Sequence, residues 1–268
     1  MPELYEVSYS HKATVAAVRD YYRFLTRMYL KESYVAEPPE GGWPEISFEN
    51  LGSLGKTNEA ILLLRHLPYI SSPDESALGA ANCLFMDWRW IARSLALGEC
   101  SAEDALYLTE GYSGLPKSMS PHVVGLTRGS YYNPSFLLDT KLGVVFWWEC
   151  HSDIKRNPSR EPISGEEYDN GPNEEETDFR CDSVAWAIPD FFELLKDLFR
   201  QLFYVPVGPR AVLYAKALKE VMPMLEAIYR EHGWPDIERY RKRECLNAIQ
   251  SLMEERDPGN ADRRPEGD

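Results

Sequence analysis

The sequence has few cysteines, and it lacks the spacings in which cysteines usually build a site. The five that occur, at positions 83, 100, 150, 181 and 245, are odd in number and include no C-x-x-C pair. This arrangement argues against a disulfide framework and against a structural zinc ribbon. We therefore expect free thiols and a reducing compartment.

A secretory leader and long hydrophobic runs are also missing. The start, MPELYEVSYSHKATV, has no basic segment followed by an apolar one. No run of about 18 apolar residues occurs anywhere, and no N-x-[ST] acceptor has a permitted middle residue. The sequence predicts a cytoplasmic or nuclear protein that is neither secreted nor inserted in a membrane.

Positive charge is scarce. The chain has 29 basic and 43 acidic residues, which gives a formal net charge of −14. Such a balance disfavours non-specific binding to nucleic acid or to anionic lipid, and it steers a basic partner toward the chain. The sequence also lacks H-E-x-x-H, EF-hand and G-x-G-x-x-G motifs. We therefore expect a basic protein partner and no nucleic acid, metal or cofactor.

Apolar residues are abundant enough to build a core. The 268 residues are 44% hydrophobic and 12% aromatic, which predicts an ordinary globular protein. From Ser10, the stretch SHKATVAAVRDYYRFLTRMYLKES repeats apolar residues every three or four positions, as one face of a long amphipathic helix does. We expect a single domain over 1–256 that begins with this helix.

Further helices are indicated by the same periodicity and by capping residues. Pro68 and Gly98 end two of the apolar patterns, and Ser101 with Asp104 forms a capping signal. The expected helices cover residues 58–67, 87–98, 101–109, 189–203, 210–232 with a break near Pro223, and 236–256.

Short strands are indicated between 122 and 150. The runs HVVGLT, PSFLLD and VVFWWEC are rich in β-branched and aromatic residues and are separated by turn residues. They predict consecutive antiparallel strands, and apolar residues on both sides of the last strand predict that both faces are covered. The expected fold class is α+β, an antiparallel sheet of short strands packed by helices, with additional helices at both termini.

The segment 152–182 has a different composition. It holds ten acidic and four basic residues together with three prolines. Such a composition buries little apolar surface, so it predicts a mobile acidic loop. The last residues, 257–268, offer nothing to bury and predict a disordered tail.

The stretch NLGSLGKT, residues 50–57, ends like a phosphate-binding loop. Asn50 stands where the motif needs its first glycine, and the preceding WPEISFE is no hydrophobic strand. The pattern is more typical of a turn that caps the following helix through Thr57 or Asn58.

Glu149, Cys150, His151 and Asp153 contain the residue types of a thiol nucleophile with its base, or of a metal site. Neighbouring residues of a strand point to opposite faces, so Cys150 and His151 cannot easily pair while the strand persists. A buried cysteine at a strand end and a histidine on the following loop is the simpler interpretation.

The order of these segments resembles the SUKH superfamily, which includes bacterial toxin-immunity proteins and a fungal regulator of cell-wall synthesis. The resemblance covers about residues 50–205: a helix ending in LLLRHLPYI, the strands VVGLT and PSFLLDTKLGVVFWWE, the acidic segment, and WAIPDFFELLKDLF. In that family a strand hairpin carries an aspartate and a glycine, here Asp139 and Gly143, and a Phe-rich helix closes the domain, here Phe191 to Leu195. Over the whole chain the sequence is most similar to fungal proteins of unassigned activity.

The resemblance implies an α+β domain that binds other proteins and has no catalytic centre. Our leading hypothesis is therefore a non-catalytic interaction protein, with a scaffold, regulatory or immunity-like role, that binds a basic protein surface. The residues we expect to face a partner or ligand are Asp139, Trp147, Glu149 and His151.

An enzyme of specialised metabolism is the alternative. Its pocket would lie beside the Trp-rich strand, and Glu149, His151 or His122 would act as acid or base. Two or more titratable groups converging on an enclosed cavity would favour this alternative.

Overall fold

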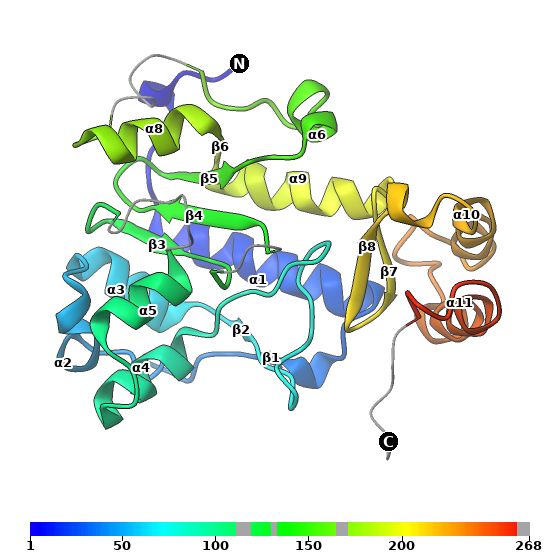
Figure 1. The fold of residues 1–268 in the computed structure, drawn as a ribbon, viewed down its shortest axis with the longest axis horizontal. Coiled ribbons are helices and arrows are strands. Elements are labelled where there is room, and N and C mark those ends of the chain that lie inside the picture. Colours follow the sequence, from blue (N-terminus) through cyan, green and yellow to red (C-terminus); the bar gives the residue numbers. More distant parts are fainter. Residues whose placement is uncertain (111–118, 130–132, 165–170, 262–268) are drawn as a thin grey trace. The chain divides into compact units, whose positions relative to one another are not determined.

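The computed structural model describes residues 1–110, 119–129, 133–164 and 171–261 (Figure 1). These residues form helices and short antiparallel strands, so the predicted α+β fold is confirmed. The chain divides into two compact units. The first contains Met1–Arg19, Ala36–Tyr69 and Phe85–Leu194, and the second contains Asp20–Val35, Ile70–Leu84 and the described part of Leu195–Asp268.

The chain passes from one unit to the other inside regular elements. Helices α1 (His11–Met28) and α9 (Ile188–Arg200) each contribute residues to both units, as do the short strands β1 (Val35–Ala36) and β2 (Tyr69–Ile70). Helix α1 was expected from its apolar periodicity, and its buried residues include Val18, Tyr22 and Leu25. Within the part of the chain that the structure describes, no helix is long and apolar enough to cross a membrane.

A four-stranded antiparallel sheet forms the centre of the first unit. Its strands β3 (Val123–Gly125), β4 (Ser135–Asp139), β5 (Val144–Trp148) and β6 (Ser183–Ala187) are paired in sequence order. The first three correspond to the predicted strands. Strand β6 was missed, because its five residues lie between an acidic segment and helix α9 and have no turn residues to mark them.

Helices cover both faces of this sheet. On one face, Phe191 of α9 contacts the rings of Phe136, Trp147 and Trp186. On the other face, Phe179 of α8 (Glu174–Asp182) packs on Phe146 at a ring-centroid distance of 5.7 Å. The expected packing of the 189–203 helix on the sheet is therefore present, and the double coverage explains the continuous apolar character of β5.

Two of the remaining helices of the first unit begin at the capping residues that the sequence indicated. Thr57 accepts a hydrogen bond from the N–H of Ala60, and Ser101 and Asp104 form a reciprocal capping box. The elements are η1 (Leu4–Glu6), α2 (Phe48–Leu51), η3 (Gly52–Leu54), α3 (Asn58–His66), α4 (Trp88–Leu97), α5 (Ala102–Thr109) and α6 (Ser152–Arg156).

The expectation of an acidic loop over 152–182 needs correction. Helices α6 and α8 lie within it, Asn173 caps α8 by accepting from the N–H of Glu176, and Glu176, Phe179 and Arg180 are buried. The average composition of the segment did not indicate that these three residues are buried. Each of them has a specific partner in the folded unit. Residues 165–170 of this segment lie outside the described residues.

The second unit contains a β-hairpin and two further helices. Strands β7 (Tyr204–Gly208) and β8 (Ala211–Tyr214) pair antiparallel, followed by η4 (Ala215–Leu218), α10 (Met222–Glu231) and α11 (Lys242–Arg256); η2 (Glu32–Tyr34) follows α1. The helix predicted over 210–232 is wrong in its first part, where β8 and η4 lie. Pro223 stands in the first turn of α10, where a missing N–H costs no hydrogen bond.

Buried aromatic side chains form much of the core of the second unit. Tyr29 stacks on Phe199 at 5.6 Å, and its hydroxyl donates to the carbonyl of Leu78 at 2.7 Å. The hydroxyl of Tyr229 donates to the carbonyl of Pro206 at 2.6 Å. These two buried phenols are therefore hydrogen-bonded, as is usual for buried aromatic residues with a polar atom. Residues 262–268 of the predicted disordered tail lie outside the described residues.

Candidate functional site

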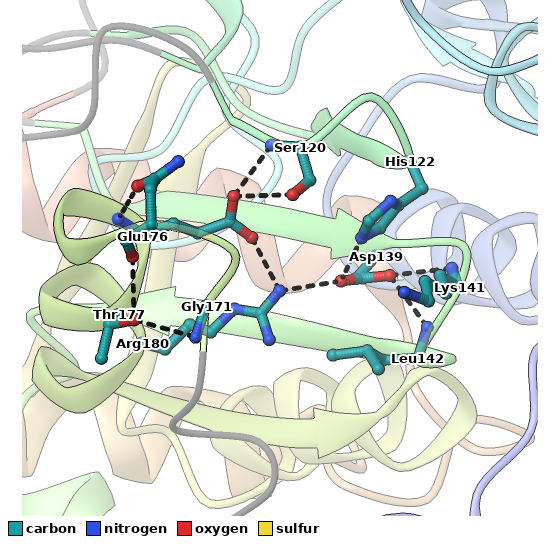
Figure 2. A network of polar contacts seen from close by, with 10 residues as sticks. Ser120, His122, Asp139, Lys141, Leu142, Gly171, Glu176, Thr177 and Arg180 are labelled. Carbon is teal, nitrogen blue, oxygen red and sulfur yellow. Dashed lines mark hydrogen bonds and ion pairs between the residues drawn. The ribbon is translucent and has the colours of Figure 1, made fainter.

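Asp139 ends strand β4 and shapes the hairpin that follows. Its side chain is fully buried, and Oδ1 accepts the backbone N–H groups of Lys141 and Leu142, both at 2.8 Å. Gly143 then adopts a φ of +76°, which an L side chain rarely adopts. Asp139 and Gly143 therefore define the β4–β5 turn. Figure 2 shows Asp139 with Lys141 and Leu142.

The other carboxylate oxygen of Asp139 faces two basic groups. Oδ2 lies 3.4 Å from Nε2 of His122 and 3.7 Å from Nη2 of Arg180. His122 directly precedes β3 and is 19% exposed, whereas Arg180 lies on α8 and is 5% exposed. The buried carboxylate thus lies between a cation and a partly exposed imidazole.

Arg180 connects this pair to Glu176, one turn earlier on α8. Glu176 Oε1 accepts from Arg180 Nη2 at 2.7 Å, and Oε2 accepts from the backbone N–H and the hydroxyl of Ser120 at 3.0 and 2.7 Å. The resulting Asp139 network, His122–Asp139–Arg180–Glu176–Ser120, links α8, β4 and the start of β3 (Figure 2).

Lys56 and Glu110 form a second buried ion pair in the first unit. The distance from Lys56 Nζ to Glu110 Oε2 is 2.6 Å. Burial raises the pKa of Glu110, the charge of Lys56 opposes that shift, and the nearby charge of Glu176 adds to it. The lysine of the NLGSLGKT stretch is thus engaged inside the fold, and Thr57, one of the two capping residues that the sequence indicated, caps α3.

The chemistry of the Asp139 network favours a structural role. Glu176 and Asp139 face Arg180, and the Ser120 hydroxyl donates to Glu176. Because these charged groups face one another inside the fold, the network fixes α8 against the sheet rather than presenting a charge to a substrate. Within the described ranges, no group of three or more His, Cys, Asp or Glu side chains could hold a metal ion.

Trp147, expected to face a partner or ligand, is 2% exposed. Its ring contacts Phe136 at a centroid distance of 4.9 Å, and Phe191 and Trp186 at 6.3 Å each. Trp147 therefore packs under helix α9, and the space beside it is occupied by aromatic core.

Glu149, Cys150 and His151 follow the end of β5. Glu149 is exposed with a φ of +50°, and burial raises the pKa of Cys150 to about 12. Nδ1 of His151 accepts the N–H of Asp153 at 3.2 Å, so the imidazole caps helix α6. Glu149, Cys150 and His151 are therefore neighbours in the chain, but Nδ1 of His151 is used to cap α6. The other candidate acid or base, His122, faces Asp139.

A groove between α4 and α5 was not anticipated from the sequence. This α4–α5 groove has a volume of about 400 Å³ and is lined by Trp90, Ser94, Glu99, Cys100, Asp104, Tyr107 and Leu108. Trp90 and Tyr107 are 39% and 54% exposed, and the nearby Leu97 is 71% exposed. The two helices contact each other within the first unit (Figure 1).

The sequence does contain a signal for this groove. Helical spacing places Trp88 and Ile91 on the buried side of α4, and it leaves Trp90 and Leu97 off that stripe. The neighbouring carboxylates give the groove a negative character. Hydrogen bonds from Ser101 lower the pKa of Asp104, and none of the described lining residues is basic.

Comparisons with protein-family models, with curated proteins and with solved structures found no match to this chain.

Proposed function

We propose that the protein is a non-catalytic interaction protein whose α4–α5 groove binds a basic segment of a protein partner. The supporting observation is the exposure of Trp90, Tyr107 and Leu97 beside the carboxylates of Glu99 and Asp104. Exposed aromatic side chains in a hollow are typical of interaction surfaces, where they anchor a partner.

The charge and size of the groove define the proposed occupant. Two carboxylates and no described basic residue line a volume of about 400 Å³, which suits one apolar anchor with a lysine or arginine next to it. The net charge of −14 steers such a basic segment toward the protein. The composition predicted a basic partner, and we propose the α4–α5 groove as the surface that binds it.

We keep the relation to the SUKH superfamily as part of this proposal, with a scaffold, regulatory or immunity-like role in the cytoplasm or nucleus. Two observations support it. Asp139 and Gly143 shape the hairpin turn, and Phe191 packs on the sheet, so the residues that carry the resemblance have defined structural roles.

The enzyme alternative has less support. It requires a pocket beside the Trp-rich strand, where the ring of Trp147 packs on three aromatic rings. Its proposed acid–base residues have other roles: His151 caps α6, and His122 faces the buried Asp139.

Selection from a library of displayed short peptides tests the proposal. Immobilised protein should enrich peptides in which a large apolar residue adjoins lysine or arginine. Their affinity should fall at least about tenfold in Trp90→Ala or Tyr107→Ala, as expected for anchor residues. Phe48→Ala is the matched control, because Phe48 is an aromatic residue of the same unit, 51% exposed and outside the groove.

Ionic strength provides a second measurement. The affinity of the selected peptides should decrease steadily as sodium chloride is added, because the attraction to Glu99 and Asp104 is screened. Peptides without basic residues, or equal affinity for the wild-type protein and Trp90→Ala, would contradict the proposal.

A further inference from the structure

The second unit contains a cavity of the opposite charge. Its volume is about 580 Å³, and it is lined by the turn of the β7–β8 hairpin, the first half of α11 and residues just after α1. Four basic side chains line it, Lys31, Arg210, Lys242 and Arg243, and none of the described lining residues is acidic. The chain as a whole has a net charge of −14, so the positive charge of this cavity is opposite in sign to that of the protein.

Two of these basic groups are held in place by other residues. Nζ of Lys242 donates to the carbonyls of Thr26 and Leu30, both at 2.7 Å, where helix α1 ends. Arg210 lies 3.2 Å from Asp74 through Nη1. Positions fixed in this way reduce the conformational entropy that ligand binding would otherwise cost.

The position of Lys242 and Arg243 is unfavourable for α11 itself. Both lie in the first turn of this helix, where the helix dipole is positive and favours acidic side chains. Burial also lowers the pKa of Lys242, and the nearby charge of Glu32 opposes that shift. Residues that lower the stability of their own helix are expected at functional sites, where binding of a ligand offsets the loss of stability.

Apolar side chains form part of the remaining wall of the cavity, together with the amides of Asn247 and Gln250. Tyr29, Val207 and Leu246 line it, and Nζ of Lys31 lies 5.3 Å from the centroid of the Tyr34 ring. Ligand sites commonly combine an apolar lining with a few charged groups, at volumes of about 300–1,000 Å³. The cavity therefore offers an apolar surface and several cations to the same ligand.

We propose that this cavity binds a small phosphorylated molecule with an apolar or aromatic body. A phosphate monoester carries close to two negative charges and presents three oxygens, so it can engage several lysine and arginine side chains together. The apolar body would lie against Tyr29, Val207 and Leu246. The site belongs to the second unit, and it is independent of the α4–α5 groove in the first.

Titration calorimetry with 1-naphthyl phosphate tests the proposal on the full chain. We expect one binding site per chain. Binding of 1-naphthol, which lacks the phosphate, and of inorganic phosphate, which lacks the aromatic body, should be much weaker. Arg243→Gln and Lys31→Gln should each weaken binding at least about tenfold, as the loss of a charged hydrogen bond does. Both side chains lie at the surface, so the variants should keep the melting temperature of the wild-type protein.

Arg230→Gln is the matched control. It removes one positive charge from the same unit, and Arg230 is 75% exposed and does not line the cavity. Its affinity for 1-naphthyl phosphate should equal that of the wild-type protein. The proposal is overturned if millimolar 1-naphthyl phosphate does not bind, if 1-naphthol binds equally well, or if the Arg243 and Lys31 variants bind as tightly as Arg230→Gln.

Discussion

Lys56 and Glu110 form an ion pair in which both side chains are almost completely buried, at 1% and 2% exposure, with Nζ and Oε2 2.6 Å apart. Lys56 lies just before α3, and Glu110 directly follows α5. The pair therefore joins two helices that are far apart in the sequence. Breaking a buried ion pair from one side is costly, because the remaining charge stays buried without its partner.

Lys56→Met should lower the free energy of unfolding by about 3–5 kcal/mol, because Glu110 would remain buried without its cation. The double variant Lys56→Met/Glu110→Leu should recover much of this loss, since apolar pairs often replace buried ion pairs at little cost. Urea denaturation of the wild-type protein, the single variants Lys56→Met and Glu110→Leu, and the double variant gives the coupling energy. A double variant that equals the sum of the two single losses would contradict a direct pairing.

The same pair predicts a dependence on pH. Burial raises the pKa of Glu110 above its ordinary 4.5. The folded state then holds more protons than the unfolded state between these two pKa values, so the contribution of Glu110 to stability falls as pH rises through that window. In Lys56→Met the pKa should rise further. The loss of stability should therefore be larger at neutral than at mildly acidic pH, and a pH-independent loss would contradict this assignment.

The stability of the protein should depend on the hydrogen-bond acceptor at position 139 as well as on the charge of Asp139. Asp139→Ala removes the acceptor of two backbone N–H groups in the β4–β5 turn and should cost about 2–4 kcal/mol. Asp139→Asn keeps an oxygen at Oδ1 for the two turn hydrogen bonds, but it loses the charge and places an NH2 group toward His122 and Arg180. Because the turn keeps its acceptor, this variant should cost roughly half as much. Thermal or urea unfolding measures both. Equal losses would show that the turn does not depend on Oδ1.

The sequence predicted the elements that have local signals. Helices α3 and α5 begin at their capping residues, and strands β3 to β5 lie where short runs rich in β-branched and aromatic residues stand between turn residues. Strand β8 was assigned to a helix, because its four residues, AVLY, are too short for a period of two to be distinguished from a helical pattern. Its strand conformation depends on pairing with β7, which is a tertiary interaction.

The buried polar groups were much harder to anticipate. Glu176 and Arg180 are four residues apart, a spacing that favours an ion pair on a helix, and this was the available signal inside the acidic segment. Their other partners, Ser120 and Asp139, are about 40–60 positions away in the chain, and no local rule connects such residues. The cavity of the second unit depends in the same way on distant elements meeting, whereas the groove lies between the consecutive helices α4 and α5.

Helix α8 should lose its protection from amide hydrogen exchange when a substitution at Glu176 breaks the Asp139 network. Glu176→Gln removes the negative charge that Arg180 pairs with, and it replaces one acceptor oxygen by a donor facing Arg180 or Ser120. We expect about 3 kcal/mol of lost stability and faster amide hydrogen exchange over 174–182. Glu174→Gln is the matched control, since Glu174 is an exposed carboxylate of the same helix. Unchanged protection of α8 in Glu176→Gln would contradict the role of the network.

The thiols should differ widely in reactivity, because the thiolate is the reacting species. Burial raises the pKa of Cys150 to about 12 and that of Cys245 to about 11, whereas Cys181 on α8 is exposed. Iodoacetamide at neutral pH should therefore alkylate Cys181 well before Cys150 and Cys245, as measured by peptide mass spectrometry over time. The rate at Cys150 should rise about tenfold per unit of pH below its pKa.

Protein unfolded in urea is the control, in which all three cysteines should react at similar rates. Labelling of Cys150 as fast as Cys181 in the folded protein would instead indicate an activated thiol beside His151, and it would revive the nucleophile hypothesis.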